Sequence, residues 1–492
     1  MMNRYYSFII PAVVCILAAS GFCFPDDTSK KSIYVSLDEI SKLALENNLD
    51  IQIAKYDVYI SRYGLDKANS IFDTFLTAKA GYSNDQPASS TVFSGNKELE
   101  NTYSLSLEKK FPTGTKVTLE GSHTRTWSDS SFVSINPAAE AETKVSLSQS
   151  LGKNFFGLRD RLEVKLAQLD IAHSRYLSLD DIEKSLADVQ KAYWNVVLKK
   201  RELEIKKDMR KEAEKLYLRH KENYSLGLVE EPDLLASEAY LKQRENDVLI
   251  AELMLKTAEN DLLFLLNRPE SEVSIIPMDN LDFSLREEDL YAVLNTAINN
   301  RRDYKALSNE ALQKDISVRI DKNSLWPEID LEASLARNGV SKKAGQAWSN
   351  VTSEDNPVLF LGLTVKVPLE NREAKSGYNI SLAEKEKVLL KLKKVERLIL
   401  RDVNNQVSAV NTLKRKAEAS KEILALQKEK LEAEGKRFKY GRSSSDLIIR
   451  YEEDFLNARL SLANDLYNYK ISRIDLDLAE NSLLNRYWKG KL

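Results

Sequence analysis

A seven-residue apolar repeat that occurs twice constrains the fold of this 492-residue chain more than any other feature. The residues that follow Gly227 at intervals of seven are Leu234, Leu241, Val248, Leu255 and Leu262. Those that follow Gly441 in the same way are Ile448, Phe455, Leu462, Tyr469 and Leu476. Each matched pair, like the two glycines, lies 214 residues apart (441 − 227). Because sustained seven-residue spacing is typical of coiled-coil packing, the chain is predicted to contain two copies of one coiled-coil plan.

A second resemblance between the two halves lies upstream of the heptads. Residues 44–48 resemble residues 297–300 at an offset of 253, and a Ser-x-x-Glu capping signature precedes each, at Ser36 and at Ser284. The two offsets differ by 39 residues (253 − 214), so the first copy carries an insertion of about that size. The chain is therefore predicted to consist of two structural repeats, at 25–270 and 271–492.

Each repeat is predicted to hold a first helix, a strand region, a very long helix and a last helix. The helices expected in the first repeat span 37–70, 158–225 and 232–267, and those in the second span 287–323, 371–439 and 444–486. At 1.5 Å per residue the long helices reach roughly 100 Å, so two shorter helices can pack end to end beside each of them. Such helices cannot be buried in a compact domain and predict an elongated bundle or assembly.

Between the first and the long helix of each repeat, the apolar period changes from helical to alternating. These strand regions are 74–150 and 328–367; the alternation is clearest at 102–107, 143–148 and 359–367, and weaker at 74–82, 115–126 and 328–336. With its flanks each run reaches about 9–11 residues, the length of a tilted strand that crosses an outer membrane. A small soluble sheet that faces the helices is the alternative.

Residues 1–24 have the features of a secretory signal peptide. Arg4 precedes an apolar run, and small residues follow it at 18–21. The alternative, a membrane anchor, needs about 20 apolar residues, and this run is shorter. Cys15 and Cys23 follow no convincing lipid-attachment motif, so no lipid anchor is predicted. Since the chain has no other cysteine, disulfides and thiolate metal sites are not expected in the mature protein.

Composition and motifs offer no support for an enzyme. The formal net charge of −2, from 72 Lys+Arg against 74 Asp+Glu, does not fit a nucleic-acid binder. His123, His173 and His220 are far apart and predict surface or inter-helix histidines rather than a metal site. A glutamate recurs every seven residues between Glu238 and Glu259, which predicts a solvated or ion-pairing stripe. No catalytic residue, cofactor or metal is therefore predicted.

Four segments make the chain resemble the TolC-type outer membrane efflux protein family over nearly its whole mature length. They are residues 36–48, the stretch from Gly227 to Ala236, residues 265–269, and residues 325–329 at the start of the second strand region. The resemblance implies a mainly α fold with membrane β: a long coiled-coil helical barrel in the periplasm. It also implies a homotrimer in which each chain gives four strands to one shared, twelve-stranded transmembrane β-barrel in the outer membrane lipid.

The strand count departs from that family pattern, because six candidate strands are present rather than four. The additional pair, at about 101–126 around the turn at 111–115, falls in the enlarged region of the first repeat. We expect it to form an added hairpin, and an enlarged barrel is the alternative.

The turns at Gly227 and Gly441 resemble the periplasmic tip of the family, where links between helices constrict the tunnel. Asp233 lies at the family's aspartate position, whereas Asp446 is shifted by one residue. Arg442 lies near the usual arginine position, and Phe438 replaces a linking tyrosine. An Arg442–Asp233 contact and a pore constriction at these residues are the functional hypothesis. The structural alternative is that Gly441 ends one helix and Asp233, beside Pro232, begins another.

The predicted function is a passive exit duct of a tripartite efflux or type I secretion system. The expected partners are an energised inner-membrane pump and a periplasmic adaptor (membrane fusion) protein, with no nucleic acid. A periplasmic or surface coiled-coil scaffold or adhesin with a soluble β head is the rival. The duplication and the return of each strand region into a long helix favour the duct.

Overall fold

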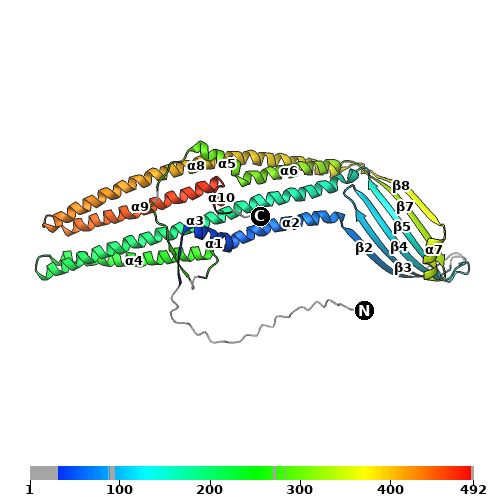
Figure 1. Ribbon diagram of the computed structural model, residues 1–492, viewed down its shortest axis with the longest axis horizontal. Helices are drawn as coiled ribbons and strands as arrows, with labels where there is room; N and C mark the ends of the chain where they lie inside the picture. The colour runs from blue at the N-terminus through cyan, green and yellow to red at the C-terminus, as the bar shows by residue number, and fades with distance from the viewer. Residues whose placement is uncertain (1–30, 87, 89–94, 270–272, 283, 489–492) are drawn as a thin grey trace, which may run out of the picture.

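The computed structural model describes residues 31–86, 88, 95–269, 273–282 and 284–488. These residues form an elongated molecule in which long helices fill one end and a single sheet fills the other (Figure 1). The predicted signal peptide at 1–24 lies outside the described residues. None of the described helices is both long and apolar enough to cross a membrane.

The helices of the first repeat follow the predicted plan. The long helix α3 is Leu158–Ser225, and α2 (Leu49–Asn69) and α4 (Glu231–Leu265) pack against it one after the other. The predicted single helix at 37–70 is wrong, because it is divided at Asn48 into α1 (Leu37–Asn47) and α2. The expected capping box at Ser36 and Glu39 is present.

The second repeat has helices of the same lengths. The long helix α8 (Arg372–Lys439) has 68 residues, as α3 has, and α9 (Ser445–Ala479) has 35, as α4 has. The first helix is again divided, into α5 (Leu290–Asn300) and α6 (Arg302–Asn323). These equal lengths support the duplication, whereas the repeat boundaries at 25–270 and 271–492 stay a prediction.

Two sequence-based details of the second repeat are wrong. The first helix does not start from Ser284: its N-cap is Asp289, whose side chain accepts a hydrogen bond from the Ala292 amide. The last helix was expected to run to 486, but it ends at Ala479, and a short helix α10 (Leu483–Tyr487) follows. Asn481, in the left-handed region at φ 51°, separates the two.

The junction where two short helices meet end to end is built in the same way in both repeats. In the first, the Asn48 side chain donates to the Leu265 carbonyl at the end of α4, at 2.7 Å. In the second, Arg301 donates to the Ala479 carbonyl at the end of α9, at 3.3 Å. Both donors lie at the helix division and both acceptors end the last helix, so the equivalent contact is made by different side chains.

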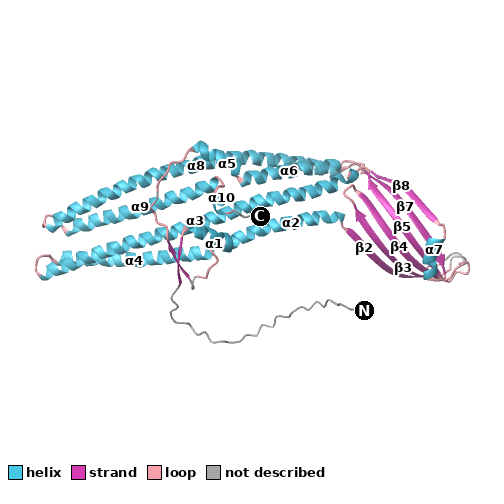
Figure 2. Ribbon diagram, viewed as in Figure 1, coloured by secondary structure: helices cyan, strands magenta, loops and turns pink. Residues whose placement is uncertain are grey.

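All six predicted strands are present in one antiparallel sheet, with the order β2-β3-β4-β5-β7-β8 (Figure 2). The strands are β2 (Thr74–Asp85), β3 (Glu98–Lys110), β4 (Thr115–Ser128), β5 (Ala138–Ser150), β7 (Glu328–Ser341) and β8 (Pro357–Lys366). The additional pair is the hairpin β3–β4, which lies inside the sheet between β2 and β5. A helix that was not predicted, α7 (Ala344–Ser353), packs on β5 and β7.

A second, two-stranded parallel sheet crosses the helices near the middle of the molecule (Figure 2). Its strands are β1 (Lys31–Val35) and β6 (Val273–Pro277), neither of which was predicted. The Tyr193 hydroxyl of α3 lies 3.1 Å from the Val35 carbonyl and 2.7 Å from a carboxylate oxygen of Asp279. This sheet therefore fixes the start of the described chain and the linker between the repeats to the same helix.

The heptad residues face the helix contacts, as the coiled-coil prediction requires. Leu241, Val248 and Leu262 are buried in α4, and Tyr469 and Leu476 are buried in α9. Each helix hairpin, α3 with α4 and α8 with α9, packs along its length. Glu245 and Glu252 lie outside these contacts and pair with Lys242 and Lys207, both at 2.9 Å, as expected of a solvated, ion-pairing stripe.

One buried ion pair joins the two repeats. Glu183 of α3 is fully buried and pairs with Arg302 of α6. The other carboxylate oxygen of Glu183 accepts from the Leu484 amide at 3.1 Å, and Asn481 also donates to Glu183, at 3.1 Å. These hydrogen bonds satisfy a buried charge that would otherwise be costly.

Candidate functional site

The two helix hairpins end in equivalent turns at the same end of the molecule (Figure 1). Gly227 and Gly441 have φ of 71° and 67°, in the left-handed region that glycine adopts without steric cost. The Leu228 amide donates to the Asn223 carbonyl at 2.9 Å, and the Arg442 amide donates to the Arg437 carbonyl at 2.9 Å. Both turns are thus glycine C-caps with the same hydrogen bonds.

The two aspartates predicted at the tip lie in the first turns of the helices that leave these glycines. Asp233 is the third residue of α4 and Asp446 the second of α9, which preserves the one-residue shift, and both are exposed. Carboxylates in a first helical turn are stabilised by the helix dipole. Arg442 is exposed as well, and within the described residues of this single chain no ion pair joins it to Asp233. The pore roles of these residues stay predictions.

His220, which the sequence predicts to be a surface or inter-helix histidine, links three helices at the tip. Its side chain is 1% exposed, and Nδ1 lies 3.2 Å from the Asp233 carbonyl oxygen of α4. Nε2 lies 3.1 Å from the Ser445 hydroxyl at the start of α9. His220 therefore joins the α3–α4 hairpin to the α8–α9 hairpin, which confirms the inter-helix prediction for this histidine.

A carboxyl group with a strongly altered pKa, Glu452, lies about two turns further along α9. Burial raises the pKa of Glu452 to about 7, and the negative charge of Glu212 acts in the same direction. The charges of Arg219 and Arg244 and the nearby Tyr240 side chain oppose that rise. No signal in the sequence marks Glu452: its equivalent in the first repeat is also a glutamate, Glu238, which the structure shows to be exposed. Only the packing of the two hairpins distinguishes them.

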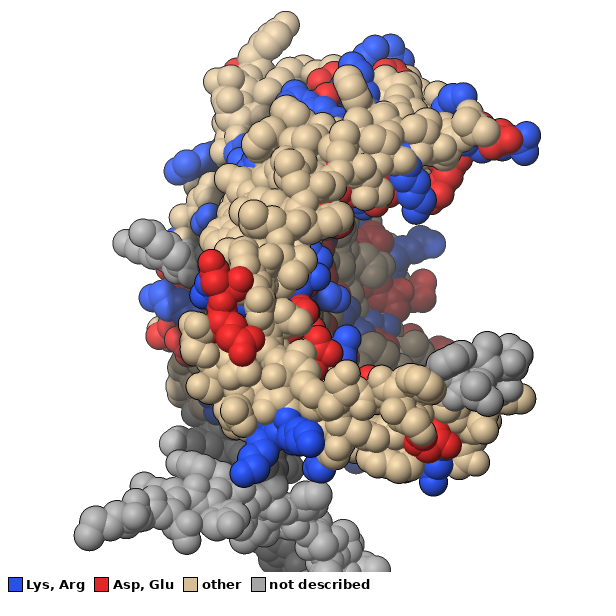
Figure 3. All heavy atoms as spheres, turned by 90° about the vertical axis from the view of Figure 1, so that its right-hand side faces the viewer, with Lys and Arg blue, Asp and Glu red and all other residues tan. Residues whose placement is uncertain are grey.

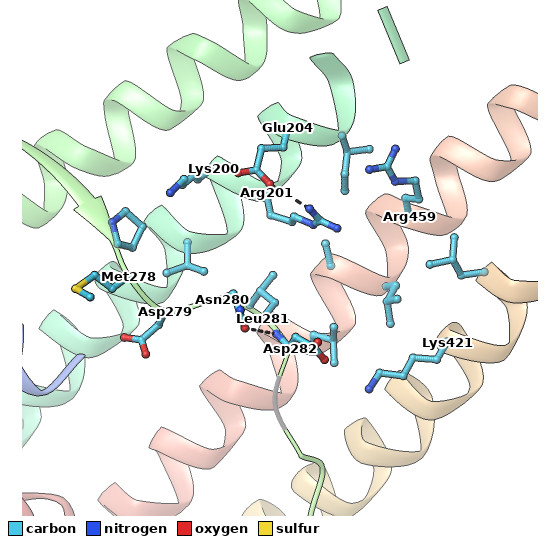
Figure 4. Close-up of a pocket in the computed structure, with 17 residues that line it drawn as sticks. Lys200, Arg201, Glu204, Met278, Asp279, Asn280, Leu281, Asp282, Lys421 and Arg459 are labelled. Atoms are coloured by element: carbon cyan, nitrogen blue, oxygen red, sulfur yellow. Dashed lines mark hydrogen bonds and ion pairs between the residues drawn. The ribbon is translucent and has the colours of Figure 1, made fainter. Parts of the chain in front are cut away.

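A recess of about 450 Å³ lies between α3, the segment after β6, α8 and α9 (Figure 4). Arg201 and Arg459 reach it from facing helices, and each already has a carboxylate partner: Glu204 at 3.1 Å and Asp208 at 3.0 Å. Among the described residues no group of three or more His, Cys, Asp or Glu could hold a metal ion. The recess is a polar hollow with charges of both signs.

The sheet has one apolar and one polar face. Register brings one residue from each strand into a single cross-strand row, made of Leu76, Leu107, Leu119, Val145, Leu335 and Leu359. All six side chains of this row are exposed. An exposed apolar surface that crosses a whole sheet indicates contact with lipid or with another protein.

The opposite face of the sheet is polar and hollowed. Glu142, Lys144 and Glu332 line a depression of about 500 Å³ on it. Viewed from the sheet end, the molecule forms an arc around a hollow (Figure 3). A polar concave face behind an apolar convex face is the arrangement of a strand set that surrounds water and faces lipid.

Exposed aromatic residues gather toward both ends of the sheet. Toward the end remote from the helices they are Tyr82, Trp127 and Trp348. Next to the helices they are Phe111, Phe155, Phe156 and Trp326. Aromatic girdles at the two edges of an apolar band are typical of outer-membrane strands.

The sheet of a single chain has two open edges, at β2 and β8. On the helical side, α2 exposes an apolar stripe of Ile53, Tyr56, Ile60 and Tyr63. The equivalent helix α6 lies between α3 and α8, where Ala306, which corresponds to Ile53, is buried. The exposed stripe of α2 therefore corresponds to a region of α6 that is covered by neighbouring helices.

Comparison with known proteins identifies related sequences and folds. The sequence profile of the outer membrane efflux protein family matches residues 114–268 and 293–482. A search of curated proteins found no match.

Three similar solved structures have the same fold. The CmeC outer membrane channel of Campylobacter jejuni is 16% identical, with a TM-score of 0.68 over 91% of this chain and 85% of that one. The outer membrane protein VceC of Vibrio cholerae is 13% identical, with a TM-score of 0.68 over 90% and 95% of the two chains. The MtrE outer membrane channel of Neisseria gonorrhoeae, in its open state, is 19% identical, with a TM-score of 0.67 over 91% and 89%.

Proposed function

The chain belongs to the outer membrane efflux protein family, and from that premise we propose that three copies form one duct through the outer membrane. The sheets cross the outer membrane, and the helices extend the duct into the periplasm. An energised inner-membrane pump delivers the substrate through a periplasmic adaptor, and this protein provides a passive path out. The family consists of outer membrane channels rather than enzymes, and the substrate passes through unchanged.

The open sheet carries this proposal. Its exposed apolar row suits lipid, but unpaired backbone groups at an open strand edge are not tolerated in a bilayer. The strand β2 runs away from the helices and β8 runs back toward them, so β8 of one chain can pair antiparallel with β2 of the next. Closing a ring of chains in this way leaves no edge.

The helical half supports the same assembly. Each chain supplies four helical columns: α3, α8, and the end-to-end pairs α2 with α4 and α6 with α9. The apolar stripe of α2 would pack on α8 of the next chain, as α6 packs on α3 within one chain. Repetition of the internal contact between chains gives a closed wall of helices.

The rival function, a coiled-coil scaffold or adhesin with a soluble β head, does not fit the sheet. A soluble head would bury its apolar face, whereas here the convex face exposes the whole cross-strand row. Near the end remote from the helices, α7 covers part of that face through Ala347 and Val351 against Ala139 and Ala141.

The tip residues are proposed to form the periplasmic constriction of the duct. The turns at Gly227 and Gly441 form the end of each chain opposite the sheet. Three chains would bring six exposed carboxylates, from Asp233 and Asp446, to that end, with Arg442 beside them. Carboxylates around a narrow aqueous opening attract cations.

Purification from outer membranes, followed by recording in planar bilayers, tests the function. We expect discrete conductance steps from the detergent-extracted protein. Leu335→Lys places a charge on the lipid side and should cost ~2–4 kcal/mol at the bilayer midplane, which lowers the assembled fraction in the membrane. Its neighbour Ser334→Lys, on the polar face, is the matched control and should assemble normally. Recovery of soluble periplasmic protein without conductance would contradict the proposal.

A further inference from the structure

The hairpin β3–β4 is built as part of the membrane sheet. Its strands have 13 and 14 residues, as do β5, which pairs with the hairpin, and β7, which pairs with β5. Every described residue of β3 from Glu98 to Lys110 is in register with β4, and β4 is in register with β5 over twelve positions. The hairpin is therefore not an appendage on the rim but fills the centre of the sheet.

The alternation of the two faces continues through this hairpin. Leu107 and Leu119 lie between Leu76 and Val145 in the apolar row. On the opposite face Ser106 and Glu120 lie between Thr77 and Lys144. Because side chains alternate along a strand, a hairpin that did not enter the membrane would have no need of this pattern.

The turn of the hairpin is fixed to the helical half. Lys110 forms an ion pair of 2.7 Å with the buried carboxylate of Asp160, in the first turn of α3. Arg161 of the same turn donates to the Pro112 carbonyl at 2.7 Å. Gly114 lies so close to Gly157 that a Cβ atom would meet the Gly157 amide nitrogen at 2.5 Å.

A neighbouring strand also holds this turn. Gln149 of β5 accepts from the Thr115 hydroxyl at 2.6 Å and donates to the Thr113 carbonyl at 3.1 Å. Contacts from both α3 and β5 place the turn at the junction of the helices and the sheet, which is the position of a barrel turn at the periplasmic end.

We propose that this hairpin enlarges the shared barrel, so that three chains close eighteen strands rather than the twelve implied by the family resemblance. The inference rests on the proposed trimeric duct. The inserted pair adds two strands and leaves the directions of β2 and β8 at the outer edges unchanged. The same antiparallel contact between chains can therefore close either ring.

The enlarged ring has a wider lumen. Barrel diameter grows about linearly with strand number at a given tilt, so eighteen strands give a barrel about half as wide again as twelve. Barrels of 16–18 strands leave an aqueous channel without a packed interior. The membrane end of this duct is then wide and lined by the polar face, and any constriction lies elsewhere along it.

Disulfide trapping in membranes tests the strand order in the assembled protein. In a background with Cys15 and Cys23 replaced by alanine, Ala78→Cys on β2 is combined with Leu105→Cys on β3, its register partner. Ala78→Cys is combined separately with cysteine at three β5 positions on the same face: Ala141, Thr143 and Val145. In the eighteen-stranded ring β2 and β5 are three strands apart, about 14 Å, which exceeds the reach of a disulfide.

We expect high cross-linking of the Ala78–Leu105 cysteine pair and none of the three β5 pairs. Cross-linking of any β5 pair, with the hairpin outside the ring, would overturn the proposal. Electron microscopy of the trimer gives an independent count: eighteen strands are expected, and a ring of twelve would refute it. A trimeric conducting particle with twelve strands contradicts only this inference, whereas a monomer without conductance contradicts the proposed function itself.

Discussion

The two repeats agree in their helices and differ in their strands. Their long helices have 68 residues each and their last helices 35 each, but one strand region holds four strands and the other holds two strands with α7. Each long helix packs along its whole length against shorter helices that lie end to end. A change in its length would therefore break these contacts. A sheet can accept a pair of antiparallel strands, because a hairpin returns the chain to its starting edge in the original direction.

The contacts between the repeats are less alike than their lengths. The pair Glu183–Arg302 joins them, whereas the residues at the equivalent positions, Arg397 and Leu49, are both exposed in one chain. Glu452 is half-buried at the tip, with one carboxylate oxygen shielded from solvent, and its equivalent Glu238 is exposed. A duplicated scaffold has therefore kept its backbone plan while its polar contacts have become specific to one repeat.

Arg302→Met gives the largest expected effect, because it leaves the fully buried Glu183 without its cation. Breaking one partner of a buried ion pair costs ~3–5 kcal/mol of stability. Thermal unfolding in detergent measures this as a lower Tm. The control, Arg397→Met at the exposed position of α8 that corresponds to Glu183, should change the Tm little. Equal Tm values for the two variants would show that the ion pair does not join the repeats.

Leu262→Ala and Leu476→Ala compare the same heptad position in the two repeats. Both side chains are at most 2% exposed, so each truncation should cost ~2–5 kcal/mol. Similar losses in unfolding experiments are expected, since both residues lie between packed helices. Glu238→Ala on the exposed side of α4 is the control, with little loss. A loss confined to one repeat would mean that the two coiled coils are not equivalent.

Glu452→Gln tests the polar difference at the tip through pH. The native carboxyl has a pKa of about 7 against an ordinary value of 4.5, so the folded state binds more protons than the unfolded state between these values. Stability should therefore fall as pH rises from about 4.5 to 7, by about 1–3 kcal/mol. The variant should lose this dependence, and Glu238→Gln should retain it. Retention in both variants would remove Glu452 as the cause.

The smallest expected effect is on ion selectivity. Asp233→Ala with Asp446→Ala should lower the cation preference of the closed channel, by about twofold for each removed carboxylate that lies ~8 Å from the ion path, because a charge at that distance in water contributes ~0.5 kcal/mol. Arg442→Ala should raise the preference. Reversal potentials under a salt gradient measure both changes, which should weaken at high salt. An unchanged reversal potential in the double variant would remove both aspartates from the pore.

Periodicity predicted most of the fold. The heptads located α4 and α9, the spans expected for the long helices matched α3 and α8 within a few residues, and alternation located all six strands of the large sheet; only the end of α9 was misplaced. These patterns are visible because one face of a long element is apolar throughout. The strands β1 and β6 have only five residues each, too few for a detectable alternation.

Features that depend on distant contacts could not be predicted. The division at Asn48 is stabilised by its hydrogen bond to Leu265, 217 residues away, and Arg302 lies 119 residues from Glu183. Sequence placed Gly227 and Gly441 at turns, because glycine at the end of a heptad run is a local signal. The burial of His220 and of one carboxylate oxygen of Glu452 requires the two hairpins to lie side by side, which no local pattern shows.

The number of chains in the particle tests the central claim most directly. A single chain leaves the edges of β2 and β8 and the apolar stripe of α2 uncovered, so the account requires an assembly that covers all three. Native mass measurement of protein extracted from outer membranes in mild detergent should give three times the mass of the mature chain. A monomeric particle that remains folded in lipid and conducts ions would contradict the account.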